Sequence, residues 1–419
     1  MAFLKLMKKK EKIGKLELLA PAGNLEKVRI GLMYGADAFY MGMPSFSMRS
    51  RTNNFTEESL MEAVKLIRDA GKVLYMTMNI YPRGNKIDAF KKHLKFVREK
   101  VKPDAIIVAD PGVFELVKEF YPGAVLHMSV QANVLNYRAV KFWADQGAKR
   151  IILPRELMLS EIKEIHENVP DIELEFFVHG AICMAYSGRC LLSNYMTGRD
   201  SNQGICAHSC RWKYKVYLEE EKRPGEMIPV DEDEHGTYFM NSKDMCLLPY
   251  LKDLRDSGIC SFKIEGRNKS EYYLATVVKA YRKAIDDMMA GKKFDKTLID
   301  EVESTANRGF IPGYLFGFPA KNDIHYGAGT PLQKKKFMGM VLEARNKTDY
   351  LVDIKNKLVV GDILEVMTPG ENFKVEVFEI FDEEGIALTE AHGGAGNRVL
   401  RFKGNKKSIP VYAMLRMKV

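Results

Sequence analysis

The feature that most constrains this chain is a regular alternation of short apolar runs with amphipathic stretches of helical period, from Leu16 to about Ala290. Such an alternation predicts strands that are each followed by a helix, and therefore a parallel sheet. The run Ala105–Ala109 is apolar throughout, which is typical of a strand that helices cover on both faces. The eight predicted strands span residues 16–19, 38–41, 72–79, 105–109, 125–129, 150–153, 173–178 and 261–264.

Eight such units in about 250 residues fit a closed (β/α)8 barrel of the TIM type, which we predict for residues 14–292. The alternative is a doubly wound open sheet, which would want a glycine-rich phosphate loop after its first strand. The sequence there, Pro21-Ala22-Gly23-Asn24, is not GxGxxG. The fold class is therefore α/β, with the barrel favoured over the open sheet.

Two further segments interrupt or follow the barrel. A cysteine-rich insertion over residues 180–258 separates strands seven and eight, and we expect in it a strand pair, Tyr214–Leu218 with Thr237–Met240. Long insertions in this position usually carry function. A glycine-rich linker over residues 293–332 precedes short β-rich segments with turn signals, which predict a small β-barrel domain over residues 333–419.

The charge balance favours an anionic partner. Lys and Arg number 64 against 55 Asp and Glu, a formal net charge of +9. Such a surplus favours nucleic acid ahead of a membrane surface, although a solvated lysine-rich surface would explain it as well. No run of about 18 apolar residues occurs, so we expect no membrane span. The lysine-rich start Met1–Lys12 lacks the apolar core of a secretory signal, and we expect a cytoplasmic protein.

Polar residues stand where the predicted strands end, which is where catalytic residues gather in such barrels. The candidate catalytic residues are Glu175, Glu265 and His179. The two glutamates suit acid and base roles, and they are also natural partners for Arg155 and Arg267. His179 and Cys183 are four residues apart and could form a nucleophilic pair, but we favour a metal-site loop there.

Four cysteines fall within 28 residues, with the spacing Cys183-x6-Cys190-x15-Cys206-x3-Cys210, and Cys246 follows. In a reducing compartment such a cluster is more often a metal site than a set of disulfides. The paired CxxC knuckles of a zinc ribbon are missing. Thiolates from well-separated loop positions suit an iron–sulfur cluster, whose ligands need only converge in space.

At these residues the sequence resembles a known family, the collagenase-like peptidases, which form group thirty-two of the peptidases of unassigned mechanism. The segment Glu175–Ser193, with its His-Gly-Ala-Ile-Cys and Gly-Arg-Cys-Leu-Leu-Ser motifs, looks like the family signature. Four more segments match the family pattern: Leu18–Gly23, Tyr34–Ala38, Asn241–Cys246 and Phe262–Arg267. Together they cover the whole predicted barrel, and the predicted β domain also fits.

The resemblance implies more than proteolysis. The better-understood members of the family are similar to oxygen-independent hydroxylation proteins that carry a [4Fe–4S] cluster and use prephenate. One branch converts the wobble uridine of tRNA to 5-hydroxyuridine, and another acts in ubiquinone synthesis. This chain most resembles the tRNA branch, because it has the β domain and the basic balance that tRNA binding requires. The resemblance implies cluster ligands at Cys183, Cys190, Cys206 and Cys246, with Cys210 as an alternative to Cys206.

Prephenate, the implied co-substrate, carries two carboxylates, which guanidinium groups bind in bidentate fashion. We therefore expect Arg155 and Arg267 to hold this small anionic molecule, with neutral hydrogen bonds from Gln131, Asn133 and Asn79. In the alternative, each arginine only pairs with a glutamate inside the barrel mouth.

The β domain is expected to help hold tRNA through cations that contact phosphates. These cations are Lys334–Lys336, Arg398, Arg401, Lys403, Lys406 and Lys407. A homologous partner chain is a further expected partner, and no membrane is expected. The alternative functions are a peptidase, a hydroxylase of a small molecule such as a ubiquinone precursor, and an RNA-binding protein without catalysis.

Overall fold

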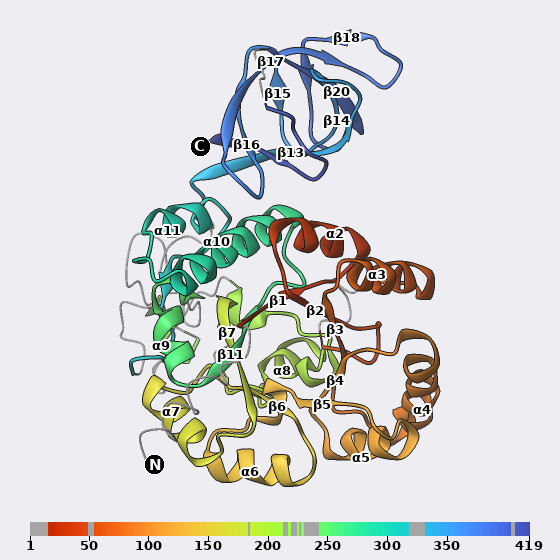
Figure 1. Ribbon diagram of the computed structural model, residues 1–419, viewed down its shortest axis with the longest axis vertical. Coiled ribbons are helices and arrows are strands. Elements are labelled where there is room, and N and C mark those ends of the chain that lie inside the picture. Colours follow the sequence, from red (N-terminus) through yellow and green to blue (C-terminus); the bar gives the residue numbers. More distant parts are fainter. Residues whose placement is uncertain are drawn as a thin grey trace, which may run out of the picture.

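The computed structural model describes residues 16–48, 54–182, 185–212, 217–218, 224–225, 228–229, 243–317, 332–403 and 407–419. Its larger part is a closed barrel of eight parallel strands (Figure 1). The strands are β1 (Glu17–Pro21), β2 (Ala38–Met41), β3 (Val73–Met78), β4 (Ala105–Val108), β5 (Leu126–Met128), β6 (Arg150–Leu153), β7 (Glu173–Ala181) and β11 (Ile259–Ile264). Because β11 pairs with both β1 and β7, the barrel closes, and the predicted (β/α)8 fold is confirmed.

Helices follow the strands and cover the outside of the barrel. They are α2 (Leu25–Tyr34), α3 (Glu57–Asp69), α4 (Ile87–Phe96), α5 (Pro111–Phe120), α6 (Tyr137–Asp145), α7 (Leu159–Asn168), α9 (Leu251–Asp256) and α10 (Glu271–Met289). Asn24 caps α2 and Thr56 caps α3, as their positions before the helical runs predict. Asp110 caps α5, so this strand-end carboxylate serves the helix and satisfies one of its unpaired amides.

The insertion extends β7 before it leaves the barrel. The short strand β10 (Asp244–Cys246) runs antiparallel to the end of β7, and β12 (Phe310–Ile311) pairs with β10. The described part of the insertion also holds α8 (Leu192–Thr197) and the two-residue strands β8 (Tyr217–Leu218) and β9 (Ile228–Pro229). β8 pairs with β9, and the partner predicted for Tyr214–Leu218, residues 237–240, lies outside the described residues, so that pairing stays a prediction.

The C-terminal part is a second closed barrel, antiparallel throughout, as predicted. Its strands are β13 (Lys335–Ala344), β14 (Asp349–Ile354), β16 (Ile363–Met367), β17 (Phe373–Phe381), β20 (Asn397–Lys403) and β21 (Met414–Lys418). The pairing β16 with both β17 and β21 closes this barrel. Its core holds alternating apolar residues of the strands, among them Val341, Val352 and Leu400.

The two barrels are joined by buried polar and aromatic contacts beside α2, α10 and the short helix α11 (Thr297–Val302) (Figure 1). The hydroxyl of Tyr34 donates to the carbonyl of Met367 at 2.9 Å. The fully buried Arg416 donates to Glu301 at 2.8 Å and to Glu365 at 2.7 Å. In the described part of the chain, no helix is long and apolar enough to cross a membrane.

Candidate functional site

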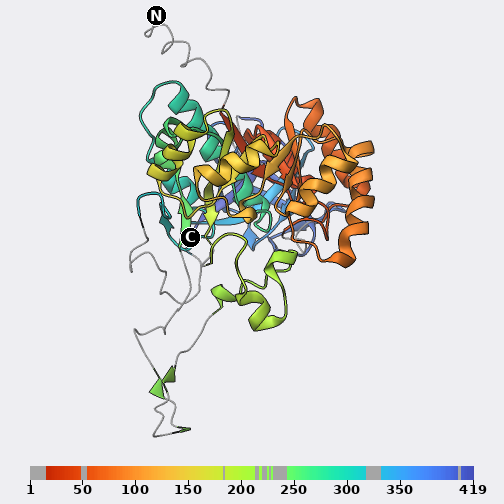
Figure 2. The ribbon, with the colours of Figure 1, turned by 90° about the horizontal axis from the view of Figure 1, so that it is seen from below.

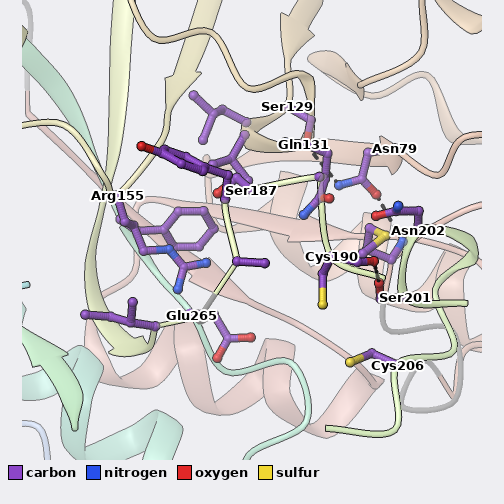
Figure 3. Close-up of a pocket in the computed structure, with 18 of the residues that line it drawn as sticks. Asn79, Ser129, Gln131, Arg155, Ser187, Cys190, Ser201, Asn202, Cys206 and Glu265 are labelled. Atoms are coloured by element: carbon purple, nitrogen blue, oxygen red, sulfur yellow. Dashed lines mark hydrogen bonds between the residues drawn. The ribbon is translucent and has the colours of Figure 1, made fainter. Parts of the chain in front are cut away.

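A cavity of about 330 Å³ opens at the carboxyl ends of the barrel strands, under residues 185–212 of the insertion (Figure 3). Its volume suits a small molecule. The polar residues that line it include Asn79, Ser129, Gln131, Arg155, Glu156, Cys190, Asn202, Cys206, His208, Cys210, Lys263, Glu265 and Arg267. Figure 3 shows Cys190 and Cys206 on one side of this space, with Arg155 and Glu265 facing them.

The insertion segment is fastened to the barrel by specific contacts. Gly188 has a φ of +74°, and a Cβ there would lie 2.1 Å from the carbonyl oxygen of Gln131, so only glycine lets the segment approach this closely. The amide of Ser187 donates to Glu156 at 3.0 Å, and Lys86 donates to Gln203 at 3.1 Å. Glu156 is thereby committed to holding the segment in place.

Two arginines bring positive charge to the cavity. The guanidinium of Arg155 lies 4.3 Å from the ring centroid of Phe177 and donates to the carbonyl of Ala181. Arg267 donates to the hydroxyl of Ser47 at 2.6 Å and to the carbonyl of Met48. The partners of Arg155 among the described residues are thus a ring and a carbonyl, with no carboxylate among them.

A third cation that lines the cavity is Lys263 on β11. It was not among the site residues predicted from the sequence. Its ammonium lies 2.6 Å from Glu175 and 4.3 Å from the ring centroid of Tyr40. Burial lowers the pKa of Lys263, and the nearby Glu175 carboxylate opposes that shift. The available signal was a charged residue within an otherwise uncharged strand, Ile259–Ile264.

Glu175 does not line the cavity. Its fully buried carboxylate lies in the barrel interior between Lys263 and Arg150, the latter at 3.1 Å. The structure therefore gives Glu175 a pairing role in the barrel interior, whereas Glu265, the other predicted acid or base, does line the cavity.

His179 is also buried outside the cavity. Its ring packs among Tyr273, Tyr281 and Phe310, and its Nδ1 lies 3.3 Å from the Tyr281 hydroxyl. Desolvation lowers the pKa of His179 to about 3, so the ring is neutral near pH 7. The register between β7 and β11 shifts between Lys263 and Ile264, which accounts for His179 facing α10 instead of the barrel interior.

Of the neutral residues predicted to bind the co-substrate, some line the cavity and one does not. Asn79 lines the cavity, and its amide donates to Ser129 at 3.2 Å while its oxygen accepts from the amide of Met48 at 3.0 Å. Gln131 lines the cavity as well, whereas Asn133, with a φ of +53°, does not. Two of the three predicted neutral residues, Asn79 and Gln131, thus line the cavity.

Three cysteines, Cys190, Cys206 and Cys210, line the cavity, and the amide of His208 donates to the sulfur of Cys206 at 3.4 Å. Such a bond is of the kind that tunes iron–sulfur ligands. Cys183 lies outside the described residues. Within the described ranges alone, no three His, Cys, Asp or Glu side chains already form a metal site. The thiols that line the cavity fit an iron–sulfur cluster in kind, because thiolate sulfur is the ligand such clusters use.

Cys246 is placed differently. On β10 it stands opposite His179, and its buried thiol lies 3.9 Å from the Tyr281 hydroxyl. Cys246 is not among the residues that line the cavity. Burial raises the pKa of the Cys246 thiol to about 11. The structure thus groups Cys210, rather than Cys246, with Cys190 and Cys206.

Comparisons with known proteins agree with this architecture. The chain is 42% identical over 417 residues to tRNA hydroxylation protein P of Escherichia coli, covering 90% of this chain and 92% of that protein. It is 35% identical to tRNA hydroxylation protein P of Helicobacter pylori, covering 97% of this chain and all of that protein. It is also 32% identical to a collagenase of Porphyromonas gingivalis, covering 96% of both chains.

Two family profiles account for both barrels. Residues 23–325 match the profile described as Peptidase family U32, and residues 333–416 match the profile described as its C-terminal domain. The matches and the relatives together cover the barrel, the insertion and the β domain. The chain belongs to peptidase family U32.

Proposed function

We propose that this protein hydroxylates tRNA, converting the wobble uridine to 5-hydroxyuridine with prephenate as the co-substrate. Relatives named for tRNA hydroxylation match nearly the whole chain. The observation that carries the proposal is the cavity itself: Cys190 and Cys206 face Arg155 and Glu265 across it (Figure 3), and Cys210 also lines it. This arrangement suits a metal cluster beside a small anionic molecule.

In this proposal the cations hold the co-substrate. Arg155 and Arg267 bind its carboxylates, and Lys263 adds positive charge from the floor. The apolar faces of Phe177 and Tyr40, which also line the cavity, pack against its ring. Glu265 is the candidate base for the proton that leaves C5 of the uracil ring.

We further propose a [4Fe–4S] cluster held by Cys183, Cys190, Cys206 and Cys210. The cluster would supply one-electron chemistry next to the cavity. Cys210 replaces Cys246 in this set because Cys210 lines the cavity, whereas the Cys246 thiol packs on Tyr281. Prephenate dependence and the cluster both derive from the family resemblance, and the thiols and arginines of the cavity support them.

Mass spectrometry of tRNA nucleosides from a deletion strain tests the reaction. We expect 5-hydroxyuridine to disappear and to return with the wild-type gene but not with Arg155→Ala. An unchanged nucleoside profile in the deletion strain would exclude the proposed reaction.

Iron analysis after anaerobic purification tests the ligand set. The wild type should be brown and hold about four irons per chain. Cys210→Ser should lose the iron and the visible absorbance, whereas the matched variant Cys246→Ser should keep both. The opposite pattern would restore Cys246 as the ligand, and stoichiometric zinc in a colourless protein would exclude the cluster.

Proteolysis is the second candidate, since one relative is named a collagenase. The cavity hydroxyls give it little support, because Ser129 accepts from Asn79 and Ser201 donates to the carbonyl of Cys190. His179, which a nucleophilic pair with Cys183 would need, is buried and does not line the cavity. Cleavage of gelatin by the purified protein, lost in Cys190→Ala, would favour this candidate.

A further inference from the structure

The short helix α8 turns its large apolar side chains outward. Leu191 is 69% exposed and Tyr195 is 87% exposed, and the two lie one helical turn apart, since the amide of Tyr195 donates to the carbonyl of Leu191 at 2.9 Å. The inward position is taken by Ser193, whose buried hydroxyl donates to the carbonyl of Arg199 at 2.6 Å and accepts from the amide of Ala207 at 2.8 Å. This is the reverse of an ordinary surface helix.

Other exposed apolar residues of the segment extend this surface. Met196 follows Tyr195 on α8, and Trp212, which is 43% exposed, directly follows the turn Ser209–Arg211 that packs against α8. We call Leu191, Tyr195, Met196 and Trp212 the α8 patch. Figure 2 shows this segment, in yellow-green, standing out from the barrel. Apolar groups gathered on a projecting segment mark an interaction surface.

The patch adjoins the mouth of the cavity. Leu192, the first residue of α8 and next to Leu191, lines the cavity, and so does the half-exposed Tyr186. A partner seated on the patch therefore lies beside the cavity opening. An enzyme that modifies a base must take that base out of its stack, and it holds the neighbouring bases on aromatic and apolar side chains.

Charge favours an anionic partner over a neutral one, and the exposed aromatic residues favour nucleic acid among anionic partners. Residues 185–212 contain three arginines and a single acidic residue, Asp200. The adjoining loop over residues 79–86, whose Tyr81 amide donates to the carbonyl of Asn202 at 3.2 Å, adds Arg83 and Lys86 and no acid. The Arg83 side chain is largely exposed, 4.0 Å from Asp200. Aromatic residues beside arginines are typical of surfaces that bind single-stranded nucleic acid.

We propose that the α8 patch is the surface on which a single-stranded RNA loop docks, its bases stacking on Tyr195 and Trp212 while the target base enters the cavity. The identity of the RNA in this proposal rests on the proposed function. Arg83 contacts the phosphates of the same loop.

The test is the binding of a synthetic tRNA anticodon stem–loop to the full-length protein, measured without turnover. Tyr195→Ala and Trp212→Ala should each weaken binding by about 5-fold to 100-fold, which is the loss of one base stack. Tyr195→Trp, which keeps an aromatic ring at this position, should bind the stem–loop as tightly as the wild type does. Phe142→Ala removes an aromatic residue that is 55% exposed on α6, outside the insertion, and should leave binding unchanged. Arg83→Ala should reduce the salt slope by about 0.7 to 0.9.

Unchanged RNA affinity in the double variant Tyr195→Ala, Trp212→Ala would overturn the proposal. So would a change in the mass of the protein assembly, measured by sedimentation, without a change in RNA affinity, because the patch would then join protein chains. If the variants lose RNA binding while the wild type shows no hydroxylation, the patch is supported and the proposed reaction fails.

Discussion

Neutralising Glu175 should destabilise the barrel, because this carboxylate is the ion-pair partner of a buried cation. Glu175 is 0% exposed and lies 2.6 Å from the ammonium of Lys263, which is itself buried. Among the described residues Lys263 pairs with this carboxylate alone, whereas Arg150 also has Glu17 and Glu173. Glu175→Gln therefore leaves Lys263 as a buried charge without a counter-charge.

Removing one partner of a buried ion pair costs about 3 to 5 kcal/mol. At about 2 °C per kcal/mol for a large domain, the melting temperature should fall by about 6 to 10 °C. The pH dependence has a defined sign. Burial already holds the pKa of Lys263 below its ordinary value of 10.5, and losing Glu175 lowers it further. Between that lowered pKa and 10.5 the unfolded chain binds more protons, so the deficit should shrink as pH rises.

Thermal unfolding of the purified protein at about pH 7 and pH 9 measures both effects. The matched control is Glu173→Gln, which removes a carboxylate 2.7 Å from Arg150 that is 55% exposed and should cost less than about 1 kcal/mol. Equal melting temperatures for Glu175→Gln and Glu173→Gln would refute the reasoning. Activity lost in Glu175→Gln at full stability would return Glu175 to a catalytic role.

Three further outcomes are expected. Arg155→Ala should weaken prephenate binding in calorimetry by about 10-fold to 100-fold, the loss of a charged hydrogen bond, and equal affinity would exclude Arg155 from the anion site. Gly188→Ala should speed proteolysis within residues 185–212, because its Cβ would meet the Gln131 carbonyl; Gly198→Ala, which shares the positive φ (+67°) but has open space around it, should speed it less. His179 has a pKa lowered from 6.5 to about 3, so stability falls as pH drops through that window; His179→Phe should lower the acid-unfolding midpoint, and an unchanged midpoint would contradict the neutral buried ring.

The barrel could be predicted from the sequence because its strands are buried on both faces and read as continuous apolar runs. The run Ala105–Ala109 became β4, and the absence of a glycine-rich loop after β1 correctly argued against the open sheet. The end of β7 was missed by three residues, since the strand continues to Ala181 where β10 pairs with it. That pairing partner is more than sixty residues away in the chain, so no local signal announces it.

The candidate site was only partly predictable, because a strand end shows which residues are near the cavity but not which way they face. Arg155, Arg267 and Glu265 come after their strands or at their ends and line the cavity. Glu175 stands lower in the same barrel, and the register shift beside His179 turns that ring toward α10. Lys263 and Glu175 form a buried pair between neighbouring strands, which only the closure of β7 against β11 brings together.

The cations of the β domain show that the sequence also does not reveal which charged residues are paired with acids. Many of the residues expected to meet phosphates already face carboxylates: Arg401 binds Asp349 at 2.7 Å, and Lys335 binds Glu365 at 2.6 Å. A paired cation attracts a phosphate less, because the neighbouring acid cancels much of its field. The segment 185–212 contains three arginines and one acidic residue, so few of its cations can be neutralised by acids of the same segment, and it presents exposed aromatic residues as well. The contact of the β domain with tRNA stays a prediction. The distribution of charge favours the insertion as the part that first contacts the reacting RNA loop.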